Sequence, residues 1–247
     1  MIIIKTEPEL DLMRKSAGIL KDAFVEVGKA VRPGVTTGEL DGIAEEYIRS
    51  RGGVPAFKGY QGYPAAICAS VNEQVVHGIP GQRKLEEGDI VGVDMGVIFK
   101  EFYSDATRSY AVGEIDEDAR RLMKVTKEAL DRGIDKARAG NHLSDISHAI
   151  QRHAEENGYS VVKVLVGHGI GRQMHEEPQI PNFGPPGQGP VLRAGMVLAI
   201  EPMVNAGGHE VLTLEDRWTF VTVDGKLSCH FEDTVAVTDD GPEILTR

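Results

Sequence analysis

The chain repeats itself at a spacing of about 106 residues, and this repeat limits the folds open to it. Arg138 and Gly140 stand 106 positions after Arg32 and Gly34, at the end of a similar helical pattern. The segment LEEGDIVGVD, residues 85–94, is matched 107 positions later by LRAGMVLAIE. Equivalent strands of two similar halves tend to lie side by side about a pseudo-twofold axis. We therefore expect one domain over residues 1–247, with halves of about 1–113 and 114–247.

Two helical patterns open each half. Their apolar residues recur every three or four positions, between residues that favour helix starts and glycines that favour helix ends. The predicted helices run from Thr6 to about Arg32, from Thr37 to Gly52, from Asp116 to about Arg138 and from Ser144 to Asn157. An apolar strand pattern follows each pair, so the repeating unit is two helices and then a strand.

Two apolar strand patterns near the end of the first half each carry an aspartate. The segment GVDMGVIFKEFYSDATRSY, residues 92–110, contains Asp94 and Asp105. If the chain turns at Phe99 and Lys100, the two aspartates lie opposite one another, where like charges destabilise a strand pair. A shared proton or a bound cation would relieve the repulsion. Alternatively, both side chains face water on an edge hairpin.

The second half contains matching acids. Glu201 ends the apolar run MVLAI at the position equivalent to Asp94. Glu232 in FEDTVAV resembles Asp105, because in both segments a threonine follows two residues after the acid. Four converging carboxylates at 4 Å would repel by roughly 4 kcal/mol per pair, even at an effective dielectric constant near 20. Two divalent cations would neutralise this charge.

Histidines supply further candidates for such a site. His168 lies between Gly167 and Gly169 at the end of an apolar strand pattern, and the glycines permit close approach of the backbone to a ligand. One imidazole with four carboxylates suits Mn, Fe, Co or Zn in a paired site, which predicts hydrolysis by a bridging water without a covalent intermediate. His77 and His175 would then stabilise an oxyanion or hold a substrate amide, unless they are simply exposed loop residues.

Composition and motifs argue against several other classes. A formal net charge of −11 with scattered Lys and Arg argues against nucleic acid or an anionic membrane as a partner. No apolar stretch approaches the ~20 residues of a membrane span, and MIIIK is too short for a signal peptide, so we expect a cytoplasmic protein. Cys68 and Cys229 are expected to be small buried hydrophobes. A nucleophile elbow, a His-Glu-x-x-His motif and a Walker loop are all absent.

The ordered Asp, Asp, His, Glu, Glu set resembles that of the pita-bread metallopeptidases. The segments NEQVVHGIPG, GVDMGV, SDATRSY, GHGIGRQMHEEP, IEPMV and FEDTVAV are similar to those of type I methionine aminopeptidases, over nearly the whole chain. Only 31 positions separate Glu201 from Glu232, which leaves no room for the helical insertion of type II enzymes. The resemblance implies an α/β (α+β) pita-bread fold, in which helices cover a central curved antiparallel sheet.

The resemblance also implies a set of metal ligands. Asp94, Asp105 and Glu232 would hold one divalent ion, and Asp105, His168, Glu201 and Glu232 would hold the other. Asp105 and Glu232 would therefore bridge two ions, which are Mn, Fe, Co or Zn. Glu201 would in addition carry the proton of the attacking water.

The substrate-binding residues follow from the same resemblance. His175 would stabilise the tetrahedral intermediate, and His77 would contact the substrate around the scissile amide. Met174 stands where several relatives carry Phe, and Phe57 stands where some carry Cys, so the pocket shape is expected to differ. The residues expected to line the methionine pocket are Tyr60, Tyr63, Cys68 and Trp218.

The implied activity is removal of the initiator methionine from nascent polypeptides whose second residue is small. We expect a monomer that works transiently near the ribosome without binding nucleic acid directly. One alternative is a prolidase or aminopeptidase P acting on X-Pro peptides, although such relatives usually carry an N-terminal domain. Another alternative is a peptide-binding relative that has lost catalysis.

Overall fold

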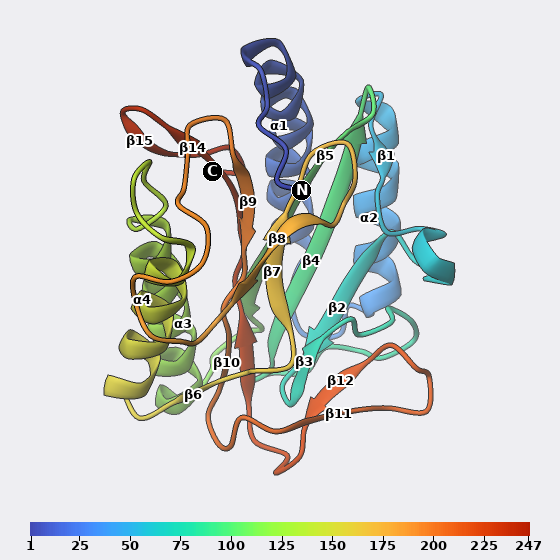
Figure 1. Cartoon of the computed structure of the whole chain (residues 1–247). Coiled ribbons are helices and arrows are strands. Elements are labelled where there is room, and N and C mark those ends of the chain that lie inside the picture. Colours follow the sequence, from blue (N-terminus) through green and yellow to red (C-terminus); the bar gives the residue numbers. More distant parts are fainter.

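The structure is a computed structural model that describes residues 1–247 as helices packed against antiparallel strands (Figure 1). The helices are α1 (Glu7–Ala30), α2 (Thr37–Ser50), the 3-10 turn η1 (Tyr60–Gly62), α3 (Glu117–Ile134) and α4 (Leu143–Glu156). The strands are β1 (Val54–Pro55), β2 (Ile67–Val71), β3 (Gln74–Val76), β4 (Ile90–Phe99), β5 (Phe102–Ala111), β6 (Ser160–Val161), β7 (Val166–Gly169), β8 (Glu176–Pro181), β9 (Val197–Ile200), β10 (Met203–Asn205), β11 (Val211–Thr213), β12 (Phe220–Thr222), β13 (Ser228–His230), β14 (Asp233–Thr238) and β15 (Gly241–Ile244).

Two larger sheets, both antiparallel throughout, form the centre of the molecule. The first has the order β1-β4-β2, with β5 also paired to β4, and the second has the order β15-β14-β9-β7-β8. The sheets meet at Thr107 and Glu232, whose backbone N–H groups each donate to the carbonyl of the other, at 3.3 and 3.1 Å. This junction brings the acid-bearing segments of both halves together, and the mixed α/β class predicted from the sequence is confirmed.

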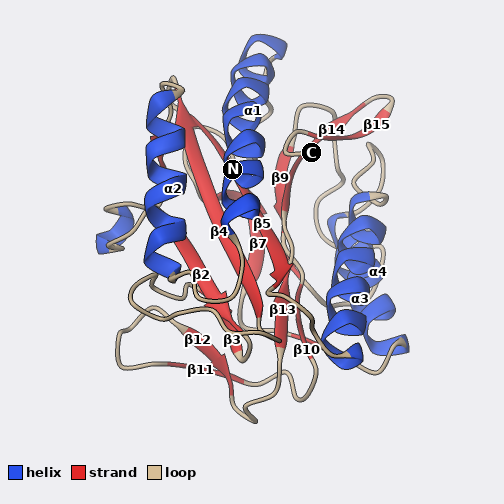
Figure 2. Cartoon of the chain, turned by 180° about the vertical axis from the view of Figure 1, so that it is seen from behind, coloured by secondary structure: helices blue, strands red, loops and turns tan.

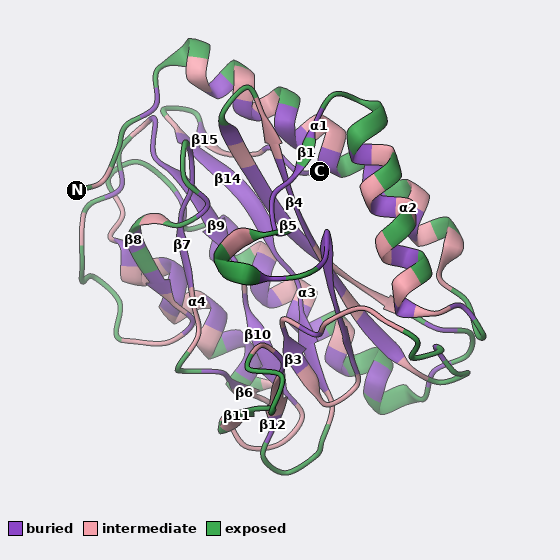
Figure 3. Cartoon of the chain, turned by 90° about the vertical axis from the view of Figure 1, so that its right-hand side faces the viewer, coloured by how far each residue is buried: buried purple, intermediate pink, exposed green.

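Each helix pair covers one of these sheets. Figure 2 shows α1 and α2 beside β4 and β2, and α3 and α4 beside the strands of the second half. Leu20 of α1 and Leu40 of α2 share a buried apolar cluster with Met95 of β4, whereas Leu122 of α3 and Ile146 of α4 belong to a separate cluster. Figure 3 shows that buried residues follow the strands, while exposed residues lie on the outward faces of α1 and α2. None of the helices has the length and apolar content needed to span a membrane.

Equivalent hydrogen bonds occur in the two halves. The backbone N–H of Gly34 donates to the carbonyl of Leu85 at 2.7 Å, and that of Gly140 donates to the carbonyl of Leu192 at 2.9 Å. In each case the loop after a long helix is bonded to the segment that leads into a central strand. The two loops are therefore held by equivalent backbone hydrogen bonds.

The hairpin between β4 and β5 has a different register from the predicted one. Asp94 is paired with Thr107, and Asp105 is paired with Gly96, so the expectation that the two aspartates lie directly opposite one another is wrong. Because side chains alternate between the faces of a strand, the two aspartates still lie on the same face, as diagonal neighbours. Both therefore reach the same side of the sheet.

Two predicted element ends also need correction. The hairpin turns at Lys100 and Glu101, which adopt φ angles of 46° and 70°, rather than at Phe99 and Lys100. Helix α3 ends at Ile134 instead of near Arg138. Its last residues are followed by tight turns, in which Ala137 N–H donates to the Ile134 carbonyl only three residues earlier. These turns complete the chain reversal without another helical turn.

Candidate active site

One cavity of about 160 Å³ between the two larger sheets collects the residues selected from the sequence. It is lined by every side chain predicted to bind metal, catalyse or hold substrate, together with Phe57 and the unpredicted Gln61. The predicted residues around it are Tyr60, Tyr63, Cys68, His77, Asp94, Asp105, His168, Met174, His175, Glu201, Trp218 and Glu232. Segments from both halves of the chain thus contribute to a single site.

Asp105, His168 and Glu232 form the centre of a metal-competent cluster. One donor atom from each of these three residues lies within 4.8 Å of the others, and all three residues are buried. Asp94 lines the same cavity, and Glu201 Oε1 lies 3.7 Å from His168 Nε2. The strands position these groups: Asp94 and Asp105 lie on adjacent β4 and β5, whereas Glu232 immediately precedes β14 and Glu201 immediately follows β9.

Three carboxylate oxygens of this cluster have no hydrogen-bond partner. They are Asp94 Oδ1, Asp105 Oδ1 and Glu232 Oε1, each fully shielded from solvent. A buried polar atom without a partner is costly, so natural structures rarely keep several such atoms together without an ion or a proton. Carboxylate oxygens and one imidazole nitrogen are suitable ligands for first-row divalent cations. The residues present therefore fit a divalent metal site.

The backbone around His168 fixes the orientation of its ring. Nδ1 lies 2.9 Å from the carbonyl of Gly169, and a carbonyl only accepts, so Nδ1 carries the ring proton. The lone pair of Nε2 is thereby left for a ligand on the Glu201 side. Gly167 permits this arrangement, because a Cβ atom there would lie 2.5 Å from the carbonyl oxygen of Ala199 on the adjacent strand.

Burial shifts the protonation equilibria of the cluster. It raises the pKa of Asp94 to about 7 and raises the pKa values of Asp105, Glu201 and Glu232 well above their usual range, with neighbouring carboxylates adding to the shift. Burial lowers the pKa of His168 to about 3, so its imidazole is neutral. A divalent cation would displace the carboxyl protons and compensate the buried negative charge.

His175 and His77 lie at the edge of the cluster. The Tyr60 hydroxyl is 2.8 Å from Nδ1 of His175, and the ring centroid of His175 is 4.3 Å from that of His168. Burial lowers the pKa of His175 and lowers the pKa of His77 to about 4, so both rings are neutral near pH 7. A hydroxyl that donates to Nδ1 places the ring proton of His175 on Nε2, where it can be donated to a substrate oxygen.

The other side of the cavity is apolar. Tyr63 and Trp218 stack edge to face with ring centroids 5.0 Å apart, and Phe57, Cys68 and Met174 belong to the same small buried cluster. The Tyr63 hydroxyl donates to backbone carbonyls at 3.0 and 3.1 Å, which fixes the ring. Thioethers make favourable contacts with aromatic ring edges. An unbranched thioether side chain therefore matches this wall.

Three residues beside the cluster were not predicted as site residues. Thr107 Oγ1 donates to Glu232 Oε2 at 3.1 Å, and Thr234 Oγ1 donates to the backbone carbonyl of Asp105 at 2.7 Å. Each threonine of the two acid-x-Thr segments is thus hydrogen-bonded to the acidic residue of the other segment. The spacing that the two segments share could have identified both threonines as residues that support the site. His230 Nε2 is buried without a hydrogen bond, 3.6 Å from Glu201 Oε2, and no sequence feature distinguishes it.

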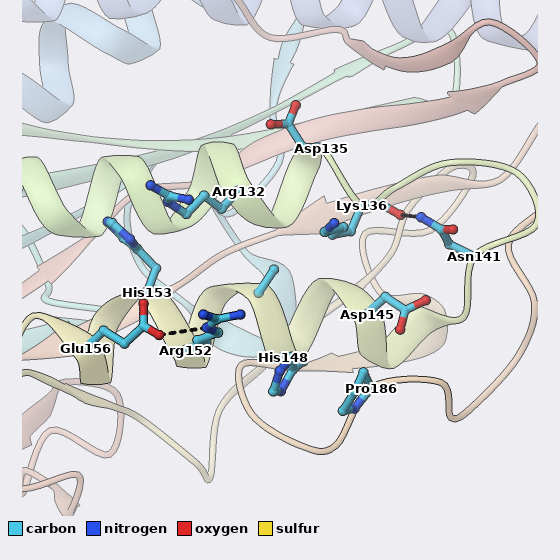
Figure 4. A pocket seen from close by; sticks show the side chains of 11 residues that line it. Arg132, Asp135, Lys136, Asn141, Asp145, His148, Arg152, His153, Glu156 and Pro186 are labelled. Atoms are coloured by element: carbon cyan, nitrogen blue, oxygen red, sulfur yellow. Dashed lines mark hydrogen bonds and ion pairs between the residues drawn. The ribbon is translucent and has the colours of Figure 1, made fainter.

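A larger cavity of about 530 Å³ lies between α3 and α4, away from the predicted residues (Figure 4). Its lining mixes exposed charges of both signs, including Arg132 and Asp135, and the ion pair of Arg152 with Glu156 at 2.7 Å. It contains no cluster of unpartnered buried groups. Chemistry is therefore assigned to the smaller cavity at the sheet junction.

Comparisons with known proteins agree with this geometry. The chain matches the model of metallopeptidase family M24 over residues 11–239. It is 56% identical over 246 residues to a methionine aminopeptidase of Clostridium perfringens, covering 100% of this chain and 99% of that relative. The crystal structure of methionine aminopeptidase from Rickettsia prowazekii matches with a TM-score of 0.99 and 42% identity, covering all of both chains. Prolidase from Pyrococcus furiosus matches with a TM-score of 0.82 and 25% identity, over 99% of this chain and 65% of that one.

The family match and the full-length similarities confirm the resemblance recognised in the motifs, and with it the pita-bread fold. They also confirm an enzyme of the metallo-exopeptidase class, which uses divalent metal. The chain belongs to metallopeptidase family M24.

Proposed function

We propose that this chain is a methionine aminopeptidase, which removes the N-terminal methionine from polypeptides whose second residue is small. The observation that carries the proposal is the shared cavity, in which the carboxylate and imidazole cluster directly adjoins a wall that fits a thioether side chain. The high identity to methionine aminopeptidases over the full chain supports the same activity.

The proposed metal ligands are Asp94, Asp105, His168, Glu201 and Glu232, which would hold two divalent ions of Mn, Fe, Co or Zn. The three unpartnered carboxylate oxygens and the free Nε2 of His168 support this assignment. When bound, the ions would act as Lewis acids and lower the pKa of water.

The remaining roles belong to side chains around the scissile amide. Glu201 would accept a proton from the attacking water and pass it to the leaving amine, since its carboxyl lines the cavity beside His168. His175 would donate from Nε2 to the developing oxyanion, and His77 would contact the substrate amide. The methionine side chain would lie among Tyr60, Tyr63, Cys68, Met174 and Trp218.

Several broader expectations form part of the same proposal. The chain would act as a single catalytic domain with halves of about 1–113 and 114–247, which the matched hydrogen bonds of Gly34 and Gly140 support. It would be a cytoplasmic monomer that meets nascent chains near the ribosome without binding nucleic acid directly. The acidic net charge of −11 agrees with the last point.

A peptide panel tests the proposed substrate. Chelator-treated protein with metal restored should release methionine from Met-Ala-Ser, leave Ala-Ala-Ser and Met-Leu-Ser nearly intact, and show no cleavage of Ala-Pro. Asp105→Asn should abolish release, whereas Asp118→Asn on the exposed face of α3 should not. Preferential cleavage of Ala-Pro would instead establish a prolidase, and folded, metal-loaded protein without any peptidase activity would establish a binding relative.

A further inference from the structure

The loop between β7 and β8 carries two residues of the proposed site, Met174 and His175, and is held by the acid that follows them. Glu176 Oε1 accepts hydrogen bonds from the backbone N–H groups of Arg172 at 2.8 Å and Gln173 at 3.3 Å. The carboxylate thus closes the loop on itself directly before His175. Its other oxygen is left for a partner from elsewhere in the chain.

That partner is Lys5, which lies 171 positions away in the sequence. Lys5 Nζ is 2.5 Å from Glu176 Oε2, and both side chains are only 4% exposed. Lys5 is fixed in turn, because its backbone N–H donates to the carbonyl of Gly195 at 2.7 Å. A Cβ atom on Gly171 would lie 2.4 Å from Lys5 Cε, so the loop is packed directly against the pair.

The pair differs from an ordinary surface contact on the same loop. Arg172 also forms an ion pair with Glu101 at 3.0 Å, but those side chains are 55% and 82% exposed. An exposed pair contributes little, whereas removal of one partner from a buried pair leaves an uncompensated charge. Neither Lys5 nor Glu176 lines the cavity that holds the metal cluster, so the proposed chemistry does not itself account for the pair.

We propose that Lys5 and Glu176 are a positioning pair that fixes His175 relative to the scissile amide, a role that rests on the proposed function. His175 has a single side-chain hydrogen bond, to the Tyr60 hydroxyl, and Tyr60 is itself partly exposed as the first residue of the 3-10 turn η1. The backbone before His175 therefore depends on Glu176 for its position. A displacement of about 1 Å at a catalytic group is enough to reduce a rate about a hundredfold.

The position of the pair also links the N-terminal segment to the substrate cleft. A third cavity, of about 540 Å³, is lined by residues that include Ile3, Glu176, His168 and His175. The Lys5 ammonium additionally lies 3.3 Å from the carbonyl of Ile3. His175 lines both this cavity and the cavity of the metal cluster, so loss of the pair would displace His175 relative to both.

Steady-state kinetics on Met-Ala-Ser, combined with a double-mutant cycle, test the inference. Glu176→Ala should lower kcat/KM about 30-fold, mainly through kcat, while the Kd for Mn²⁺ changes less than about threefold. Lys5→Met should lower kcat/KM about tenfold, and Lys5→Met combined with Glu176→Gln should recover part of the loss, because no unpaired charge remains. Glu101→Gln, which removes only the charge of the exposed pair with Arg172, is the matched control and should retain wild-type kinetics.

Comparing the effect of Glu176→Ala in wild-type protein and in His175→Ala protein shows whether Glu176 acts by positioning His175 or by a general structural role. In that background Glu176→Ala should lower kcat/KM less than about threefold, since residues that act as a unit are not additive. Amide hydrogen exchange at Arg172 and Gln173 should accelerate in Glu176→Ala, which reports the loop without reference to activity. Full activity of Glu176→Ala, or an equal loss with and without His175, would overturn the inference. Wild-type protein that releases no methionine would instead refute the proposed function.

Discussion

In the metal-free protein, the free energy of unfolding should fall as pH rises above about 6.5. Burial raises the pKa values of Asp94, Asp105, Glu201 and Glu232 in the folded chain. In the unfolded chain these carboxyls ionise near pH 4, so at higher pH the folded state holds more protons. The free energy of unfolding must then fall as pH rises toward the folded pKa values. Buried histidines with lowered pKa values act in the opposite direction only below about pH 6.5, where unfolded imidazoles gain protons.

The size of the effect follows from the number of protons retained. Each proton held only by the folded cluster changes the free energy of unfolding by about 1.4 kcal/mol per pH unit. One retained proton between pH 6.5 and 8 therefore costs about 2 kcal/mol, and the midpoint of a chain of this size falls about 2–4 °C per kcal/mol. The thermal midpoint of the metal-free protein should drop by about 4–8 °C across this interval for each proton that the folded cluster retains up to pH 8. More retained protons would enlarge the drop.

Differential scanning calorimetry of chelator-treated protein measures this slope directly. Saturating Mn²⁺ should flatten it, because metal-bound carboxylates are already deprotonated. Asp105→Asn removes one carboxyl and should reduce the slope, whereas Asp118→Asn on the exposed face of α3 should leave it unchanged. A metal-free midpoint that stays level or rises between pH 6.5 and 8 would refute the argument that these carboxyls are buried with their protons.

Three further substitutions test other parts of the structure. Thr107→Val removes the hydroxyl that donates to Glu232 Oε2 and should weaken Mn²⁺ binding about tenfold by calorimetric titration, with little change if that hydrogen bond is unimportant. Trp218→Ala opens the apolar wall and should raise KM for Met-Ala-Ser about tenfold with a smaller change in kcat; an unaltered KM would place the methionine side chain elsewhere. Ile146→Ala creates a cavity between α4 and the second-half strands and should lower the free energy of unfolding by about 2–5 kcal/mol in urea titrations, against less than 1 kcal/mol for a substitution at exposed Val164.

Local sequence patterns predict the four long helices and the acid-bearing strands, whereas the residues of the apolar wall were expected only from the family resemblance. The capping box predicted at Thr6 marks the start of α1 and is present in the structure. Helix α2 was expected to start after Thr37, and its capping box instead uses Thr36, one position earlier. Acids in otherwise apolar strands cannot be buried separately, so they are found together at the sheet junction. The catalytic and metal-binding roles of these residues remain predictions, because position alone does not demonstrate them.

Contacts that depend on exact geometry were not predictable in the same way. The β4–β5 turn uses Lys100 and Glu101 at positive φ, where Gly or Asn is the usual sequence signal. The turn was therefore predicted one residue too early, and the observed partner of Asp94 is Thr107, two positions after the predicted partner. The bond between Lys5 and Glu176 joins positions 171 residues apart and has no counterpart in the sequence pattern. His230 beside Glu201 likewise appears only when the two segments pack.

The central claim is that the carboxylate and imidazole cluster binds the metal that drives methionine release. Free methionine released from Met-Ala-Ser should be measured while Mn²⁺ is added in known ratios to chelator-treated wild-type protein and to Asp105→Asn. We predict no release without metal, a rise that saturates at no more than two ions per chain, and no activity for Asp105→Asn at any ratio. Full release by the metal-free protein, or wild-type activity in Asp105→Asn, would contradict the account.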